Sequence, residues 1–385
     1  MLPTIIVNKH TPYAEQVFGS IGNVIGLASS EFTREAVMHA EALIVRSETR
    51  VSQKLLEGTS VRFVGTVTVG TDHVDLDYLR ERNIGFAHAP GSNAQSVAEY
   101  ILSALLTLAV RRNFSLREKT LGVVGVGHIG SKVVRIAESL GMRVMQYDPP
   151  LARKTKGTQF VTMEELLTAD ILTLHVPLTT TGPDRTYHMF DEHMLRSMKP
   201  GAILINSSRG SVVETKAVKK VLKENLLSDV VLDVWENEPT IDTDLLSAVS
   251  IGTPHIAGYS LDGKLNAVQM IYRELCGFLH RTPEVDVFDM VNADPLPAID
   301  ADGEDQTLER SVKRIIDPVY DIGIDDTSFR TISTLPERER PEYFSSLRSS
   351  YRIRRECSQY TVTLPASMKS AAEILRTIRF TVNCA

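Results

Sequence analysis

The chain has 385 residues, 43% of them hydrophobic, and a formal net charge of −6 at pH 7. This length suffices for two or three domains with their own cores, and the acidic balance argues against nonspecific nucleic-acid binding while leaving room for local basic pockets. Its longest nearly apolar stretch, residues 101–110, is too short to cross a membrane, and residues 1–9 lack a signal-peptide pattern. Cys276, Cys357 and Cys384 are too scattered for a disulfide framework or a zinc site. We therefore expect a cytoplasmic protein without a membrane or nucleic-acid partner.

Short β-rich runs alternate with amphipathic stretches over the first ninety residues. The amphipathic stretches are residues 13–19, 33–39 and 76–82, and the expected strands are residues 4–8, 24–28, 42–46, 62–68 and 85–89. Strands separated by helices of this length predict a parallel sheet that is covered on both faces.

A second α/β series follows a long apolar stretch. Residues 96–110 predict a mostly buried helix. The strands expected after it are residues 120–124, 143–147, 171–175, 202–206, 230–234 and 250–252. The sequence therefore predicts two doubly wound units.

The amino-acid composition of the sequence changes near residue 282. Residues 285–302 are rich in Pro, Asp and Ala and predict a connector. Beyond it, residues 308–320 and 342–348 are expected to be helical, whereas residues 360–364, 366–377 and 380–383 predict a strand, a helix and a strand. This pattern suits a small α+β module. Its arginines include Arg338, Arg340, Arg348, Arg352, Arg354 and Arg355, whose simplest interpretation is a solvated surface.

A glycine loop, GVGHIG, occupies residues 125–130 between a predicted strand and a predicted helix. In such a loop Gly125 permits the tight turn, Gly127 lets the backbone approach a pyrophosphate, and Gly130 allows close packing of helix on strand. Asp148 ends the next strand, where a carboxylate accepts hydrogen bonds from the ribose and repels a 2′-phosphate. The motif in this context predicts NAD rather than NADP binding.

Arg209 follows the apolar strand AILIN and two serines. It should therefore emerge at the carboxyl end of a strand, where doubly wound sheets bind ligands. A guanidinium there can hold a carboxylate through two parallel hydrogen bonds. As a lone residue, an arginine is more often a surface ion-pair partner, so the assignment depends on the acid and the histidine downstream.

His255 lies in the segment TPHIAG, which predicts a constrained turn. Its imidazole can take a hydroxyl proton while hydride leaves the adjacent carbon, and Glu238 can fix its tautomer and stabilise its protonated form. Asp233, on the preceding strand, is a candidate partner for the nicotinamide carboxamide. Because Arg209 supplies the electrophile, we expect no catalytic metal.

These residues stand within signatures that resemble the D-isomer-specific 2-hydroxyacid dehydrogenases. The signatures are VGTVTVGTDHVD, PGSNAQSVAEY, LGVVGVGHIG, ILTLHVPLT, MKPGAILINSSRGSVVE, VVLDVWENEP and IGTPHIAG. The resemblance implies an α/β fold with two doubly wound parallel-sheet domains of the Rossmann or flavodoxin type and a small C-terminal α+β dimerisation domain. It places a discontinuous substrate-binding domain at residues 1–93 and 259–282, an NAD-binding domain at 94–258 and the dimerisation domain at 283–385, with hinges near residues 92–98 and 257–259 and the active site in the cleft.

The resemblance also implies roles for single residues. Arg209, Glu238 and His255 correspond to the catalytic trio of the family, and Ser47, Thr68 and Tyr259 to positions that contact the substrate. The implied NAD contacts are Gly125, Gly127, His128, Ile129, Gly130, Asp148, Val176, Ser207, Ser208, Asp233 and Gly258. The segments VRSETRV, TPHIAGYSLDGK and LRSSYRIRRE favour a branch that acts, as a homodimer, on a phosphorylated 2-hydroxy acid.

Two alternatives stay open from the sequence. One is another dehydrogenase of the family, such as one acting on D-3-phosphoglycerate. The other is a nucleotide-sensing corepressor, which can keep the trio, although the C-terminal extension favours an enzyme. The chain departs from the family pattern at Ser208, before the arginine, and at Glu214 and Thr215 after it.

The C-terminal arginines give a last prediction. A dianionic phosphate needs cationic donors, and few stand in the cleft motifs beyond Arg46 and Lys264. We predict that Arg348, Arg352 or Arg354 binds the substrate phosphate across a dimer interface. A chain that ends at Asp286 is then expected to be a monomer that still binds NAD.

Overall fold

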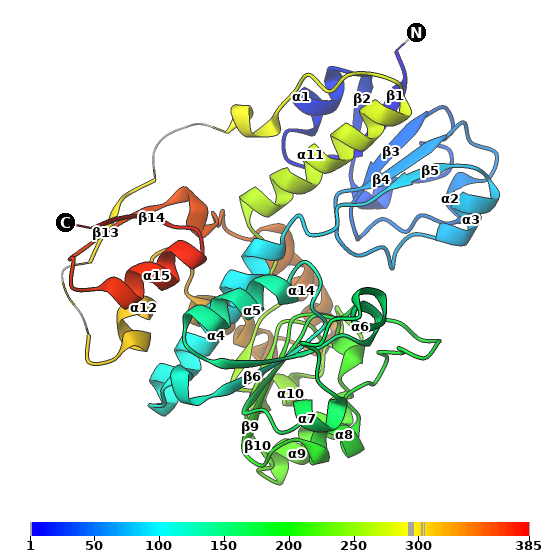
Figure 1. The fold of residues 1–385 in the computed structure, drawn as a ribbon. Helices are drawn as coiled ribbons and strands as arrows, with labels where there is room; N and C mark the ends of the chain where they lie inside the picture. Colours follow the sequence, from blue (N-terminus) through cyan, green and yellow to red (C-terminus); the bar gives the residue numbers. More distant parts are fainter. Residues whose placement is uncertain (1, 292–295, 302, 304, 385) are drawn as a thin grey trace. The chain divides into compact units, whose positions relative to one another are not determined.

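The computed structural model describes residues 2–291, 296–301, 303 and 305–384. The chain forms two compact units (Figure 1), of which unit 1 comprises Met1–Asn93 and Ser260–Pro295, and unit 2 comprises Ala94–Tyr259 and Leu296–Ala385. It therefore passes between the units after Asn93, after Tyr259 and again after residue 295. Most of the C-terminal extension belongs to the same unit as the glycine loop, whereas the domain boundaries given above stay a prediction.

Unit 1 is built around a five-stranded parallel sheet in the order β2-β1-β3-β4-β5. Ile5 and Val7 of β1 enter the core on one face and Ile6 enters the core on the other, as the two-residue period of a strand requires. The sheet is therefore covered on both faces, as predicted. Its strands are β1 (Thr4–Asn8), β2 (Asn23–Leu27), β3 (Ala42–Val45), β4 (Phe63–Thr66) and β5 (Gly85–Ala87), and its helices are α1 (Ala14–Gly19), α2 (Gln53–Leu56), α3 (Leu76–Glu81) and α11 (Leu261–Phe278).

Unit 2 contains a six-stranded parallel sheet in the order β11-β10-β9-β8-β6-β7. An isolated parallel bridge between Gln146 and Phe160 adds one more position beside β7, which completes the strand order of a Rossmann sheet. The direction of winding reverses between β6 and β8, the place where such sheets bind ligands. The strands are β6 (Thr120–Val124), β7 (Arg143–Tyr147), β8 (Ile171–Leu174), β9 (Ala202–Asn206), β10 (Leu227–Leu232) and β11 (Ile251–Gly252).

Helices surround this second sheet. The long helix α4 (Ala94–Arg112) runs two residues further at each end than predicted and is buried along most of its length. The others are α5 (Gly130–Ser139), α6 (Pro149–Thr155), α7 (Met163–Leu166), α8 (Glu192–Ser197), α9 (Thr215–Lys223) and α10 (Thr243–Ala248).

The C-terminal extension continues the core of unit 2. A three-stranded parallel sheet, β12-β13-β14, carries α15 in its crossover (Figure 1). Helix α12 contacts α4 and α15, and α15 also contacts α5. Val312, Ile315, Ile374 and Leu375 lie in one apolar cluster with Leu105 of α4 and are fully buried there. These elements are α12 (Leu308–Ile316), α13 (Ile322–Arg330), α14 (Arg340–Ser349), α15 (Lys369–Thr377), β12 (Ile299–Asp300), β13 (Thr361–Leu364) and β14 (Thr381–Cys384).

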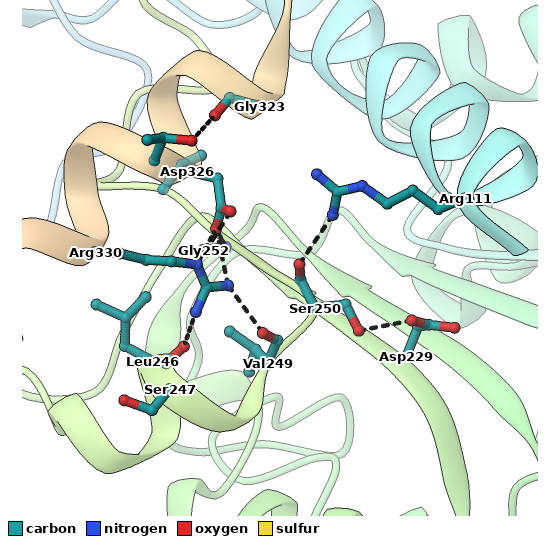
Figure 2. A network of polar contacts seen from close by, with 12 residues as sticks. Arg111, Asp229, Leu246, Ser247, Val249, Ser250, Gly252, Gly323, Asp326 and Arg330 are labelled. Atoms are coloured by element: carbon teal, nitrogen blue, oxygen red, sulfur yellow. Dashed lines mark hydrogen bonds and ion pairs between the residues drawn. The ribbon is translucent and has the colours of Figure 1, made fainter.

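Helix α13 is tied to the edge of the sheet by a network of polar contacts (Figure 2). Arg330 donates to the carbonyl oxygens of Leu246 and Val249 at 2.8 and 2.9 Å and forms an ion pair with Asp326. Asp326 in turn accepts the buried backbone N–H of Gly252 in β11 at 2.7 Å. The extension therefore fixes the strand that leads directly into the TPHIAG turn.

Three elements differ from the sequence prediction. Residues 34–39 form turns rather than a helix, because the Thr33 hydroxyl accepts the N–H of Ala36 and the following bonds at Met38 and Ala40 span only three residues. Helix α13 was not predicted, and β12 lies inside the segment predicted as a connector. Both elements depend on partners far away in the sequence.

Candidate active site

The glycine loop has the geometry that its motif predicts. Gly125 has a φ of +85°, and a side chain there would bring its Cβ to 2.6 Å from the carbonyl oxygen of His175. At Gly130 an added Cβ would lie 2.0 Å from the carbonyl oxygen of Gly125, so strand and helix touch. At Gly127 an added Cβ would meet nothing within 4 Å. The backbone at Gly127 is thus open to a ligand, as a dinucleotide requires.

Asp148 holds the same loop from the next strand. Its Oδ2 accepts the N–H of Val126 at 2.8 Å, and its Oδ1 accepts the N–H of Leu151 at 2.9 Å, which caps α6. Each carboxylate oxygen keeps a further lone pair for a ribose hydroxyl. The side chain that is predicted to bind the ribose therefore also positions the loop.

Two buried polar atoms at adjacent strand ends have no hydrogen-bond partner among the described residues, namely Nδ1 of His175 and Oγ of Ser207. The two residues follow Leu174 and Asn206, which are register partners in β8 and β9. Burial lowers the pKa of His175 to about 3, so its imidazole is neutral. Orphaned polar groups beside the glycine loop fit a polar ligand. The sequence analysis did not single out His175, although it lies in the quoted segment ILTLHVPLT.

The other predicted cofactor residues differ in exposure. Val176 is half-buried, and its Cγ1 would lie 3.0 Å from a Cβ at Gly125. His128 is exposed, Ile129 is the residue before α5, and Gly258 is half-buried. The glycine loop, Asp148 and the orphaned atoms of His175 and Ser207 fit an NAD molecule, whereas NAD contacts of these other residues stay a prediction.

Arg209 is presented by a turn that Asn206 builds. The amide of Asn206 donates to the carbonyl oxygen of Arg209 at 3.0 Å, and its Oδ1 accepts both the N–H and the hydroxyl of Ser208 at 3.0 and 2.8 Å. A Cβ at Gly210 would lie 2.0 Å from the backbone of Trp235, so only glycine lets this turn pack there. The Arg209 guanidinium itself donates to the carbonyl oxygen of Ser208 at 2.8 Å.

Glu238 and His255 are joined by a hydrogen bond of 2.7 Å between Oε2 and Nδ1. The other oxygen of Glu238 accepts the N–H of Trp235 at 2.7 Å. Burial would raise the pKa of Glu238, but His255, Trp235 and Arg348 together bring it below the ordinary value. Because Glu238 engages Nδ1, the Nε2 atom of His255 is the one left for proton transfer.

Asp233 shapes the turn that carries His255. Its carboxylate accepts the hydroxyl of Thr253 at 2.6 Å and the N–H groups of Ile256 and Ala257 at 2.8 and 2.9 Å. His255 itself has a φ of +58°, a left-handed conformation that these bonds support. Burial raises the pKa of Asp233. The sequence pattern predicts a cofactor role for Asp233 but does not reveal its partner Thr253, which also contacts the Tyr100 hydroxyl at 2.8 Å.

Tyr259 contacts the C-terminal extension of its own chain. Its hydroxyl accepts a hydrogen bond from Nη2 of Arg348 at 3.1 Å, and the guanidinium lies 5.6 Å from its ring centre. Arg352 pairs with Asp325. Arg354 is only 3% exposed and donates to the carbonyl oxygens of Ala257 and Ser96. Of the three arginines predicted to reach a neighbouring subunit, Arg354 is therefore excluded, because its side chain is buried inside its own unit.

Ser47 and Thr68 belong to unit 1, where each follows a strand of the sheet. Ser47 is exposed two residues after β3, beside the ion pair that Arg46 and Glu48 form at 3.5 Å. The Thr68 hydroxyl lies 2.7 Å from that of Thr66 and donates to the carbonyl oxygen of Gly70 at 2.9 Å. Their contacts with a substrate stay a prediction.

Two further observations concern the described residues as a set. They contain no group of three or more His, Cys, Asp or Glu side chains that could hold a metal ion. None of the helices formed by the described residues is both long and apolar enough to span a membrane.

Comparison with known families gives two matches. A family model described as the NAD-binding domain of D-isomer specific 2-hydroxyacid dehydrogenases matches residues 104–257. A second model, for a domain of unknown function, matches residues 291–378. The first contains the glycine loop, Arg209, Glu238 and His255, and the second contains the extension.

Known proteins resemble the chain over nearly its full length. A protein of Salinibacter ruber named erythronate-4-phosphate dehydrogenase is 43% identical over 95% of this chain and 96% of the relative. A protein of the same name from Salmonella arizonae is 42% identical, with 98% and 97% coverage. Among solved structures, the D-lactate dehydrogenase of Aquifex aeolicus in complex with NAD and lactic acid superimposes with a TM-score of 0.59 at 27% identity, over 72% of this chain and 95% of that one.

The family expected from the sequence is confirmed by these comparisons, as are the α/β fold and the cofactor. The protein is an NAD-dependent oxidoreductase. The chain therefore belongs to the D-isomer specific 2-hydroxyacid dehydrogenase family, where it groups with the proteins named erythronate-4-phosphate dehydrogenase.

Proposed function

We propose that this chain oxidises 4-phospho-D-erythronate with NAD, giving (R)-3-hydroxy-2-oxo-4-phosphooxybutanoate, a step in the biosynthesis of pyridoxine 5′-phosphate. The near full-length relatives of that name support the choice of substrate. The single structural observation that carries the proposal is the bond of 2.7 Å between Glu238 and His255. This pair provides the base that oxidation of a secondary alcohol needs.

The chemistry divides between His255 and the cofactor. NAD, when bound, accepts the hydride that leaves C2 of the substrate. Nε2 of His255 takes the proton of the C2 hydroxyl, so that the C2–O bond becomes a carbonyl while one proton and one hydride leave. The Glu238 carboxylate keeps Nδ1 protonated and stabilises the positive charge that His255 gains.

Arg209 is assigned to the substrate carboxylate. A guanidinium can hold both carboxylate oxygens and polarise the neighbouring C2 oxygen, which lysine cannot do in the same geometry. The backbone near Val69 and Gly70 is assigned as a further carboxylate contact. We assign contacts with the rest of the acid chain to Ser47, Thr68 and Tyr259.

The geometry of unit 2 supports the cofactor contacts that we assign. Asp148 is assigned to the ribose hydroxyls and the backbone at Gly127 to the pyrophosphate. The remaining assigned contacts are Gly125, His128, Ile129, Gly130, Val176, Ser207, Ser208, Asp233 and Gly258. The carboxylate of Asp148 supports a preference for NAD over NADP, because it repels a 2′-phosphate.

We further propose that the protein is a homodimer of the cytoplasm. All three cysteines are free thiols, with Cys276 and Cys357 buried, which suits a reducing compartment. Sedimentation of the purified protein tests the dimer.

The substrate is tested by NAD reduction with a panel of 2-hydroxy acids. We expect kcat/KM for 4-phospho-D-erythronate to exceed that for D-3-phosphoglycerate and D-lactate by at least about 100-fold, the discrimination that several charged contacts can give. Higher efficiency with D-3-phosphoglycerate would assign the chain to another reaction of the same family.

A further inference from the structure

The chain passes between the two units after Asn93 and after Tyr259, and a single C-terminal segment contacts the unit 2 side of both passages. We call this segment, residues 348–357, the arginine segment. It begins in the last turn of α14 and precedes β13. All of its contacts described below lie within unit 2.

At the second passage the arginine segment holds Tyr259. Arg348, in the last turn of α14, donates to the Tyr259 hydroxyl at 3.1 Å and faces its ring at 5.6 Å. Tyr351 packs its ring edge-on to the same tyrosine, with 5.9 Å between ring centres. Tyr259 is therefore held through its hydroxyl and its ring, and the positive charge of Arg348 also lowers the pKa of Glu238.

At the first passage the same segment holds the start of α4. Arg354 donates to the carbonyl oxygen of Ser96 at 2.9 Å and lies 3.4 Å from the buried carboxylate of Glu99. Glu356 accepts the Ser96 hydroxyl at 2.7 Å. Arg354 also donates to the carbonyl oxygen of Ala257 at 3.3 Å. One side chain therefore joins the start of α4 to the TPHIAG turn, residues 253–258, which we call the histidine turn.

Contacts with α13 hold the arginine segment in place. The hydroxyl of Tyr351 donates to Asp325 of α13 at 2.7 Å, and Arg352 pairs with the same carboxylate. The next residue of α13, Asp326, accepts the N–H of Gly252, just before the histidine turn (Figure 2). Polar contacts thus link β11 to α13, and α13 to Tyr351 and Arg352, which follow Arg348 closely in the chain.

We propose that Arg348 is a positioning residue for the oxidation, which acts in its own chain by holding Tyr259 in the orientation that receives the substrate. The remainder of the arginine segment holds Arg348 and the histidine turn in fixed positions relative to each other. This inference rests on the proposed function, because Tyr259 is assigned there as a substrate contact. It replaces the expectation that Arg348 works across a dimer interface.

A double-mutant cycle tests the connection to Tyr259. Arg348→Ala and Tyr259→Phe should each raise KM for 4-phospho-D-erythronate about tenfold or more, with a smaller change in kcat, and the affinity for NAD should stay within about twofold. If Arg348 acts through the tyrosine, the double variant should be little worse than Arg348→Ala alone. If the KM increases of the two single variants multiply in the double variant, the proposal is overturned.

Arg338→Ala is the matched control, because Arg338 is largely exposed and pairs only with neighbouring Glu339 among the described residues. Its KM should equal that of the unaltered protein. Arg348→Lys, which keeps the charge but lacks the planar fork, should recover part of the affinity lost in Arg348→Ala. Should Arg348→Ala fail to fold, the cycle is run with Arg348→Lys. A normal KM in Arg348→Lys at normal stability, together with additive effects in the cycle, contradicts the positioning role.

Mixed subunits separate action within a chain from action across subunits. Differently tagged Arg348→Ala and His255→Ala chains are co-expressed and the mixed dimer is purified through both tags. If Arg348 served the neighbouring site, the mixed dimer would contain one intact site and show about half of the normal activity. We expect activity no higher than the residual level of Arg348→Ala. A monomeric protein would give no doubly tagged species, which also excludes action across subunits. Recovery to half would overturn the proposal, whereas an unaltered protein that does not oxidise the substrate would instead overturn the proposed function.

Discussion

Oε2 of Glu238 lies 2.7 Å from Nδ1 of His255, on a turn whose backbone is held by the buried carboxylate of Asp233. Burial acts to raise the pKa of Glu238, but His255, the N–H of Trp235 and Arg348 lower it overall. A carboxylate with a lowered pKa stays ionised to lower pH than a free glutamate, and its stabilising effect is lost only as the pH falls through that lowered value. The pair is therefore an ionised acid beside an imidazole throughout the neutral range.

Glu238→Gln should shift the pH dependence of the oxidation. Glutamine cannot compensate the charge of a protonated imidazole, so the acid limb of kcat/KM should move to lower pH by about one unit. His255→Ala should lower kcat by about 10²- to 10⁴-fold at every pH, because it removes the base itself. Steady-state rates between pH 5 and 10 measure both effects. An acid limb that stays in place in Glu238→Gln would contradict the assigned partnership.

Asp148→Ala should change cofactor choice as well as affinity. It removes the predicted ribose acceptor and the repulsion of a 2′-phosphate, so the preference for NAD over NADP should fall about tenfold or more. The cap of α6 is lost too, which costs about 0.5–2 kcal/mol of stability. Asp191→Ala is the control, because Asp191 caps α8 through a similar bond of 2.9 Å to Met194. The Asp191→Ala variant should lose similar stability and keep its cofactor preference. If its preference also changed, the change in Asp148→Ala would have to be attributed to lost stability.

Arg209→Lys should damage substrate handling more than cofactor binding. Losing one of two charged hydrogen bonds costs about 1.5–3 kcal/mol, which corresponds to about 10- to 150-fold in kcat/KM. The affinity for NAD, measured by fluorescence titration, should change little, and the pH profile should keep its shape. A lysine variant with normal kcat/KM would show that Arg209 does not hold the carboxylate.

A chain that ends at Asp286 should not fold into a soluble NAD-binding protein. A soluble NAD-binding monomer is the expectation from the sequence, but the structure contradicts it, because Val312, Ile315 and Ile374 share one buried core with α4. Removing them would expose a large apolar face, which favours aggregation. Thermal denaturation and gel filtration of the truncated chain check this. A soluble, cooperatively melting product with normal NAD affinity would mean that the extension is an independent domain.

Much of the fold could be predicted from the sequence, because the strands of both large sheets are short β-rich runs between amphipathic stretches. Strands β1, β6, β7 and β9 have the predicted bounds. The sequence could not predict β12, a two-residue strand that exists only through its pairing with β13. It also missed α13, whose sequence IGIDDTSFR contains a glycine and two β-branched residues near its start and is stabilised by contacts with β11.

The candidate site likewise combines contacts that the sequence predicts with contacts that it does not. Glu238 and His255 are recognisable because their motifs are close together in the sequence, and they are hydrogen-bonded in the structure. The contact between Arg348 and Tyr259 joins residues that are 89 positions apart, and no local pattern encodes which of several arginines makes it. Basic residues that looked alike in the sequence thus differ in the structure, with Arg354 buried and Arg338 exposed.

Transfer of a label from C2 is the most direct test of the proposed reaction. The protein is incubated with NAD and 4-phospho-D-erythronate that carries deuterium at C2, and the reduced cofactor and the phosphorylated product are analysed by mass spectrometry. We expect one deuterium in each NADH and a 2-oxo acid product in equal amount, both nearly abolished by His255→Ala. Unlabelled NADH, or no NADH under conditions where D-3-phosphoglycerate is oxidised, would contradict it.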